Sequence, residues 1–201
     1  MKQRCAAFFL ASVICLSLLL SACGGGGQQS NADIEPVGLD HSIADTPVLL
    51  TSVGQSPDVE MVKVLLERVG IEPTVDNRAD GSELYDAQTL VLAVGGSAKG
   101  LGAAGTNADQ EIDRVECLTA AADEAGLTII AIHLGGTARR GELSDRFIVP
   151  SFEKADYAIV VDRGDKDGFM ASLAAEHEIP MDYTSTIVAI EQPLSLAFGA
   201  D

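Results

Sequence analysis

Cysteine is scarce in this chain: of four cysteines in 201 residues, only Cys117 lies beyond residue 23. Cys5 and Cys15 lie in the stretch 1–22, which contains an apolar run, and Cys23 follows that stretch. If the stretch is cleaved off and Cys23 is modified, Cys117 has no partner and no intrachain disulfide is expected. Cys117 lies in a helical segment beside acidic residues, which favours packing at the edge of the core over a reactive thiol.

Basic residues are few as well, with 13 Lys and Arg against 30 Asp and Glu. Cleavage after residue 22 would remove Lys2 and Arg4 and no acid, leaving 11 basic residues against 30 acidic ones and a net charge of −19. A surface of this sign repels nucleic acid and anionic lipid headgroups, so we expect neither as a partner.

The sequence also lacks the patterns that hold metals and nucleotides. His41, His133 and His177 are scattered, so we predict no metal site. The string Gly100–Gly105 matches G-x-G-x-x-G, but five residues separate it from its strand and no acid ends the next strand. The dinucleotide fingerprint needs both features, so we predict no cofactor.

No apolar run reaches the roughly 20 residues of a comfortable transmembrane helix. A shorter run over 6–20 follows the basic start Met1–Arg4, and the small residues before Cys23 suit a cleavage site, so we predict a signal peptide over 1–22. Leu20–Cys23 resembles the bacterial lipobox, which implies a lipid on the Cys23 sulfur and acyl chains, such as palmitate, as a membrane anchor. The alternative is plain secretion with a free Cys23.

The remaining chain divides by composition. Residues 23–46 are rich in Gly, Gln, Ser and Asn without an apolar period, which predicts a flexible tether behind the acylated Cys23. Residues 47–198 suit one domain with one core. We therefore expect an exported lipoprotein, anchored to the outer face of the cytoplasmic membrane or to an outer membrane if the cell has one.

Within 47–198, apolar runs of strand length alternate with segments of helical period. We predict strands over 47–53, 74–75, 89–94, 127–132 and 156–161. We predict helices over 56–70, 107–125, 142–152 and 169–177, and leave 186–198 open between strand and helix. The alternation predicts an α/β fold: a single open, mostly parallel five-stranded sheet with helices on both faces, flavodoxin-like or Rossmann-like.

The loops that follow the strands of such a sheet all leave its carboxyl edge. These loops hold five of the eleven basic residues beyond residue 22: Lys99, Arg139, Arg140, Arg163 and Lys166. Glycine-rich backbone and helix N-termini add N–H donors at the same edge. The pattern predicts a site for a small anion, although the arginines could instead pair with Glu142 and Asp145.

We expect three groups of ligand-binding residues around this site. The first wall would be Ser52, Gln55, Ser56, Gly95, Gly96, Ser97 and Lys99. The second wall would be His133, Gly136, Thr137, Arg139 and Arg140. One side would be closed by Asp162, Lys166 and Asp167.

Two other functions stay open. Ser97, His133 and Asp162 each follow a strand, so an extracytoplasmic hydrolase using Ser97 and His133 is one alternative, which needs hydrogen-bond contact among them. The other is an interaction module that docks through the loop 133–145, with a membrane or transporter protein as partner.

Several blocks of the chain also resemble a known family. They are Thr51–Asp58, Val94–Gly105, Gly135–Asp145 and Lys166–Phe169, reading TSVGQSPD, VGGSAKGLGAAG, GGTARRGELSD and KDGF. The blocks are similar to those of an uncharacterised bacterial lipoprotein family catalogued only as a domain of unknown function. The resemblance covers about 47–198 and implies a shared fold and site without an activity.

Overall fold

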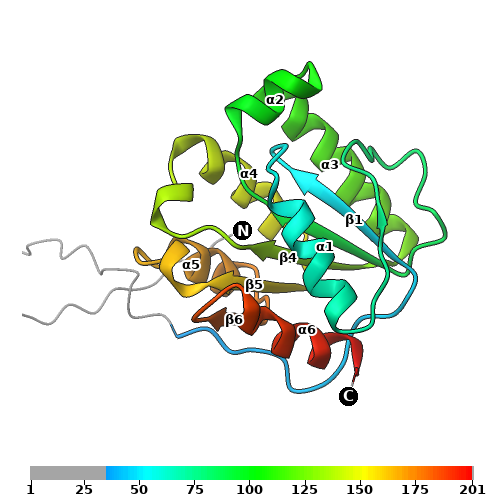
Figure 1. The fold of residues 1–201 in the computed structure, drawn as a ribbon, viewed down its shortest axis with the longest axis vertical. Coiled ribbons are helices and arrows are strands. Elements are labelled where there is room, and N and C mark those ends of the chain that lie inside the picture. The colour runs from blue at the N-terminus through cyan, green and yellow to red at the C-terminus, as the bar shows by residue number, and fades with distance from the viewer. Residues whose placement is uncertain (1–34, 201) are drawn as a thin grey trace, which may run out of the picture.

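Six parallel strands form one open sheet in the order β2-β1-β3-β4-β5-β6 (Figure 1). The structure, a computed structural model, describes residues 35–200, so the expected signal peptide, Cys23 and the first part of the tether lie outside the described residues. The strands are β1 Val48–Val53, β2 Thr74–Val75, β3 Thr89–Val94, β4 Thr128–His133, β5 Tyr157–Val161 and β6 Met181–Thr184. The order begins as in flavodoxin-like sheets, 2-1-3-4-5, and adds a sixth strand.

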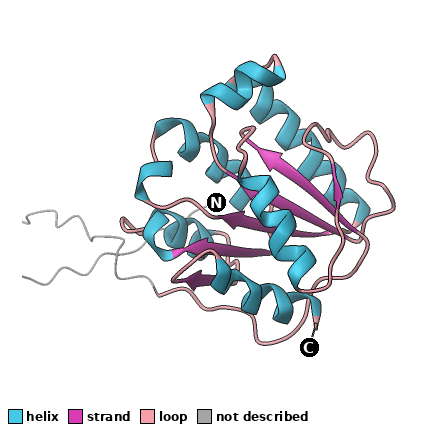
Figure 2. Cartoon of the chain, viewed as in Figure 1, coloured by secondary structure: helices cyan, strands magenta, loops and turns pink. Residues whose placement is uncertain are grey.

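Helices cover both faces of the sheet (Figure 2). They are α1 Asp58–Arg68, α2 Ala98–Ala104, α3 Ala108–Ala125, α4 Glu142–Phe152, α5 Phe169–Glu176 and α6 Glu191–Phe198, with 3-10 turns at Thr137–Arg139, Asp162–Gly164 and Val188–Ile190. Apolar side chains of α1 and α6 pack on one face, in front in Figure 1, and those of α3, α4 and α5 pack on the other. The prediction of a single open, parallel α/β sheet with helices on both faces is confirmed.

The register of the central strands places the glycine-rich loops together. Every residue of β1 and β3 is buried, as their continuous apolar sequences require, and Val53 lies opposite Val94. The carboxyl ends of β1 and β3 therefore lie side by side. The backbone N–H of Gly95 donates to Val53 O at 3.0 Å, and that of Ser97 donates to Gly54 O at 2.9 Å.

The prediction of five strands is wrong, because β6 adds a sixth at the edge of the sheet. Met181 and Thr184 are buried, whereas Asp182 and Tyr183 between them are half-buried. A strand of four residues that includes an aspartate lacks the continuous apolar run that reveals the central strands. Residues 186–198, which the sequence left open, form the 3-10 turn at 188–190 and α6.

Two further details differ from expectation. The stretch 95–105 is not a loop throughout, because Ala98–Ala104 forms α2 with Ser97 as its N-cap. Cys117 is exposed rather than packed at the edge of the core. It lies on α3 between the buried residues Val115 and Leu118, so it faces away from the sheet.

Residues 35–46 pack against the domain instead of forming a free tether. Val37 O accepts a hydrogen bond from Met181 N at 2.9 Å, and the N–H groups of Ile43 and Ala44 both donate to Ala197 O. Composition could not predict this, because the partners lie at the far end of the chain and no apolar period marks the segment. Within residues 35–200, no helix is long and apolar enough to cross a membrane.

Candidate functional site

A cleft of about 410 Å³ lies between the carboxyl ends of β1 and β3. The strand order switches at this point, because β2 lies on one side of β1 and β3 lies on the other. Ligands of open α/β sheets bind at such switch points. We call it the switch-point cleft. It is lined by Ser52, Gln55, Ser56, Pro57, Val59, Glu60, Asn77, Ser97, Lys99, Gly100 and Ala103.

A buried ion pair contacts the loop after β1, which lines this cleft. Glu111, 2% exposed, is bonded on α3 to Arg114, with 2.7 Å between Glu111 Oε1 and Arg114 Nη2. Glu111 Oε1 also accepts from Gly54 N at 3.1 Å and from Gln55 Nε2 at 3.0 Å, while Arg114 donates to Ser52 O at 2.6 Å. The pair therefore fixes the loop that leaves β1. The sequence analysis did not identify either residue.

Gln55 is held in an unusual backbone conformation at the mouth of the cleft. Its φ of 53° lies in the left-handed region, which is uncommon for a residue other than glycine. Its side-chain Nε2 donates to Asn77 O at 2.9 Å as well as to Glu111. Such conformations persist where surrounding contacts determine them, and they concentrate at functional sites.

Two of the three serines that line the cleft, Ser97 and Ser56, accept hydrogen bonds at the starts of helices, while the third, Ser52, donates its hydroxyl to Ser56 O at 3.0 Å. Ser97 Oγ accepts from Gly100 N at 3.0 Å as the N-cap of α2. Ser56 Oγ accepts from Asp58 N at 3.3 Å at the start of α1. Pro57 occupies the N-cap position of α1, and Ser56 lies one residue earlier. Each serine thus has a structural role beside any contact with a ligand.

Arg140, expected in the second wall, is enclosed by carboxylates. Its Nε donates to Asp145 at 2.7 Å, and its Nη atoms donate to Asp167 at 3.1 and 3.3 Å. Nη1 also donates to Gly164 O at 2.6 Å, and the guanidinium lies 5.0 Å from the ring centre of Phe169. The alternative pairing with Asp145 is therefore confirmed, and Arg140 ties the loop after β4 to the loop after β5.

The other rim cations differ in their partners. Arg139 pairs with Asp58 at 2.8 Å, rather than with Glu142, and joins the loop after β4 to α1. Lys166 lies 3.6 Å from Asp162. Within residues 35–200, Lys99 and Arg163 have no ion-pair partner, and Lys99 alone of the rim cations lines the switch-point cleft.

His133 is fully buried at the end of β4. Its Nδ1 lies 2.9 Å from Val94 O, and since a carbonyl only accepts, Nδ1 carries the hydrogen. Burial lowers the pKa of His133 below its ordinary value, so the ring is neutral at pH 7 and Nε2 is a bare acceptor, which no described group satisfies. A catalytic relay requires hydrogen bonds from His133 to Ser97 and to Asp162. Among the described residues, neither of these hydrogen bonds is present.

The structure separates the expected site into two parts. The cleft includes five of the predicted residues, Ser52, Gln55, Ser56, Ser97 and Lys99. The second wall and the closing side lie around the loops after β4 and β5, where Thr137 Oγ1 bonds Arg163 O and Gly136 precedes that turn. Gly95 and Gly96 follow β3 and do not line the cleft, and Gly96 N donates to Ser144 Oγ at 3.2 Å, which joins this loop to α4. Asn77 and Glu60, which also line the cleft, were missed.

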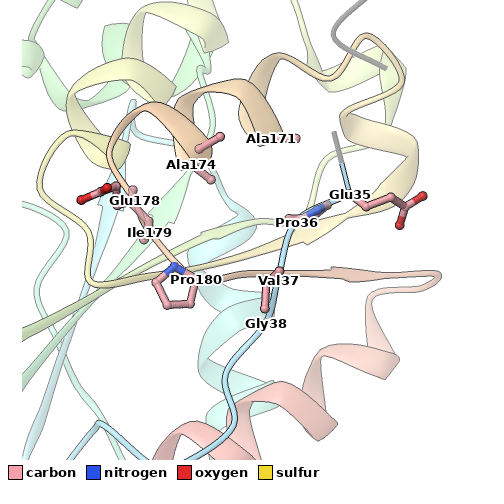
Figure 3. Close-up of a pocket in the computed structure, with 10 residues that line it drawn as sticks. Glu35, Pro36, Val37, Gly38, Ala171, Ala174, Glu178, Ile179 and Pro180 are labelled. Atoms are coloured by element: carbon pink, nitrogen blue, oxygen red, sulfur yellow. The ribbon is translucent and has the colours of Figure 1, made fainter. Parts of the chain in front are cut away.

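A second groove, of about 330 Å³, lies between the segment Glu35–Gly38 and α5 (Figure 3). Its lining is mostly apolar, with Pro36, Val37, Ala174 and Ile179 among its residues. It carries no convergent set of polar groups, so it is a weaker candidate than the cleft. Among residues 35–200, no group of three or more metal-ligating side chains is present.

The fold and the cleft define an open parallel α/β protein with a cleft at its switch point. The chain belongs to the family described as a domain of unknown function, DUF6305, whose model matches residues 45–198. The resemblance to a domain of unknown function is thereby confirmed, and the membership supplies no activity.

No curated protein matches the chain. Among solved structures, AlinE4, an SGNH-hydrolase family esterase, is 9% identical over 70% of this chain and 77% of its own, with a TM-score of 0.30. A mutant of the same esterase is 10% identical with the same coverage and TM-score. A TM-score this low supports no conclusion about fold or catalysis here.

Proposed function

We propose that this protein binds a small anionic solute in the switch-point cleft. The observation that carries the proposal is the position of Lys99, an ammonium without an ion-pair partner among the described residues, at the cleft of a chain with a net charge of −17. Arg139, Arg140 and Lys166 are each neutralised by a carboxylate, so the anion would bind beside Lys99 rather than in the second wall.

The surroundings of Lys99 support this placement. The lining combines apolar surface from Pro57, Val59 and Ala103 with a few polar groups, the usual make-up of small-molecule sites. The volume of about 410 Å³ is in the range of such sites. Glu111 accepts hydrogen bonds from Gly54 and Gln55 in the loop after β1, so the site is formed before any ligand arrives.

Lys99→Ala is expected to abolish stabilisation by the solute, because it removes the only cation that lines the cleft among the described residues. The full chain, purified in detergent, would be melted with a panel of carboxylates, amino acids, sulfate and phosphate. Circular dichroism suits a chain without tryptophan. A solute at 100 times its Kd adds about 2.7 kcal/mol, a rise in Tm of about 5–10 °C.

Lys154→Ala is the matched control, since it removes the same charge before β5, at the opposite edge of the sheet. This variant should respond to the solute like the unchanged chain. If no compound raises the Tm, or if both variants lose the response equally, the proposed site is wrong.

We further propose that the domain lies outside the cytoplasmic membrane, anchored by a lipid on Cys23. The support is the basic start, the apolar run and the small residues before Cys23. Cys23→Ser should move the protein from the membrane fraction to the soluble fraction, whereas Cys117→Ser should leave it on the membrane. Membrane retention of the Cys23→Ser variant would contradict the anchor.

A further inference from the structure

We infer that the solute of the switch-point cleft is a small monocarboxylate that also carries a hydroxyl or amino group, and that Gln55 selects it. The inference rests on the proposed function, because it names the chemical class that the same cleft would take.

The side-chain amide of Gln55 has a fixed orientation. Its Nε2 has two hydrogens, and both are used, one by Asn77 O at 2.9 Å and one by Glu111 Oε1 at 3.0 Å. A flipped amide would place oxygen against two acceptors, which fixes the assignment. Gln55 Oε1 is therefore the group left for a ligand, and it can only accept a hydrogen bond.

A second acceptor lies in the same cleft. Asn77 Oδ1 is buried and receives no hydrogen bond from the described residues. Buried acceptors are normally satisfied, so a ligand that donates hydrogen bonds suits this position. A simple anion such as sulfate or acetate has no donor to offer to Gln55 or Asn77.

The charges of the lining limit the anion. Among residues 35–200, Lys99 and Glu60 are the only charged residues that line the cleft, one of each sign. One ammonium matches one carboxylate, while Glu60 repels a second negative charge and attracts an amino group. Gln55 Oε1 would accept from the hydroxyl or amino group of the solute as its carboxylate binds Lys99.

The test uses three probes with the same carbon skeleton: propanoate, racemic lactate and L-alanine. Isothermal titration calorimetry on the full chain in detergent should give a Kd for lactate or alanine at least about tenfold below that for propanoate, the worth of one good hydrogen bond. Gln55→Met keeps the side-chain length and removes the acceptor, so lactate should then bind within about twofold of propanoate, while Glu60 still attracts the ammonium of alanine.

Gln110→Met is the matched control, because Gln110 is exposed on α3 and outside the cleft. The ratio of affinities is the deciding readout, since a variant that only loosens the fold weakens all probes alike. Equal binding of propanoate and the other two by the unchanged chain would overturn this inference and leave the proposed function standing. Binding of none of the three would overturn this inference, and the melting panel with Lys99→Ala would then decide the proposed function separately.

Discussion

Glu111→Ala is expected to lower the free energy of unfolding by about 3–5 kcal/mol, the usual effect of removing one partner from a buried ion pair. Glu111 is 2% exposed and the Arg114 side chain 12% exposed, so the variant leaves a guanidinium with little water around it. Gly54 N and Gln55 Nε2 lose their acceptor at the same time. For a domain of this size, the Tm should fall by about 10 °C or more.

Urea unfolding followed by circular dichroism measures this effect. Glu116→Ala is the control, because Glu116 is exposed on the same helix and its loss should change stability by less than about 0.5 kcal/mol. A Glu111→Ala variant as stable as Glu116→Ala would show that the ion pair does not hold the loop. The same variant should also weaken solute binding, since Gln55 would lose the contact that orients its amide.

The second large effect is expected from Asp165→Ala, which should lower the free energy of unfolding by about 3 kcal/mol. The side chain of Asp165 is fully buried and accepts from Met170 N and Ala171 N, both at 2.8 Å, and from the Tyr183 hydroxyl at 2.7 Å. It therefore caps α5 and joins that helix to β6. Removing it leaves two backbone N–H groups and a phenol without their acceptor in the interior.

Asp167→Ala makes a matched comparison two residues away. Asp167 is 65% exposed and pairs with Arg140, so its loss should cost at most about 1 kcal/mol. Thermal melts of both variants at one pH test the contrast. Similar losses for the two would mean that the stability of the rim comes from its ion pairs and not from the Asp165 cap.

The fold was predictable because its central strands can be recognised from the sequence. β1 and β3 are buried on both faces and read as unbroken apolar runs, and the alternation with helices dictates parallel pairing. β6 was missed because an edge strand has no such run. α2, Ala98–Ala104, was missed because it has only seven residues and two of them are glycines.

The candidate site was predicted only in part, for a related reason. Loops that follow parallel strands must meet at one edge, which placed Gln55, Ser97 and Lys99 together correctly. Sequence cannot show which charges meet across that edge. Arg140 is held by acids of two different loops, and Glu111 and Arg114 look like a solvated pair on a helix until the loop after β1 covers them.

Amide chemical-shift mapping tests the central claim most directly. The full chain, labelled with ¹⁵N in detergent, would be titrated with the solute that raises its Tm most. Binding in the switch-point cleft predicts that the largest shifts occur at Gln55, Asn77 and Lys99 and are lost in Lys99→Ala. Shifts centred on Arg139–Gly141, or in the groove beside Val37, would contradict the account and place the ligand elsewhere.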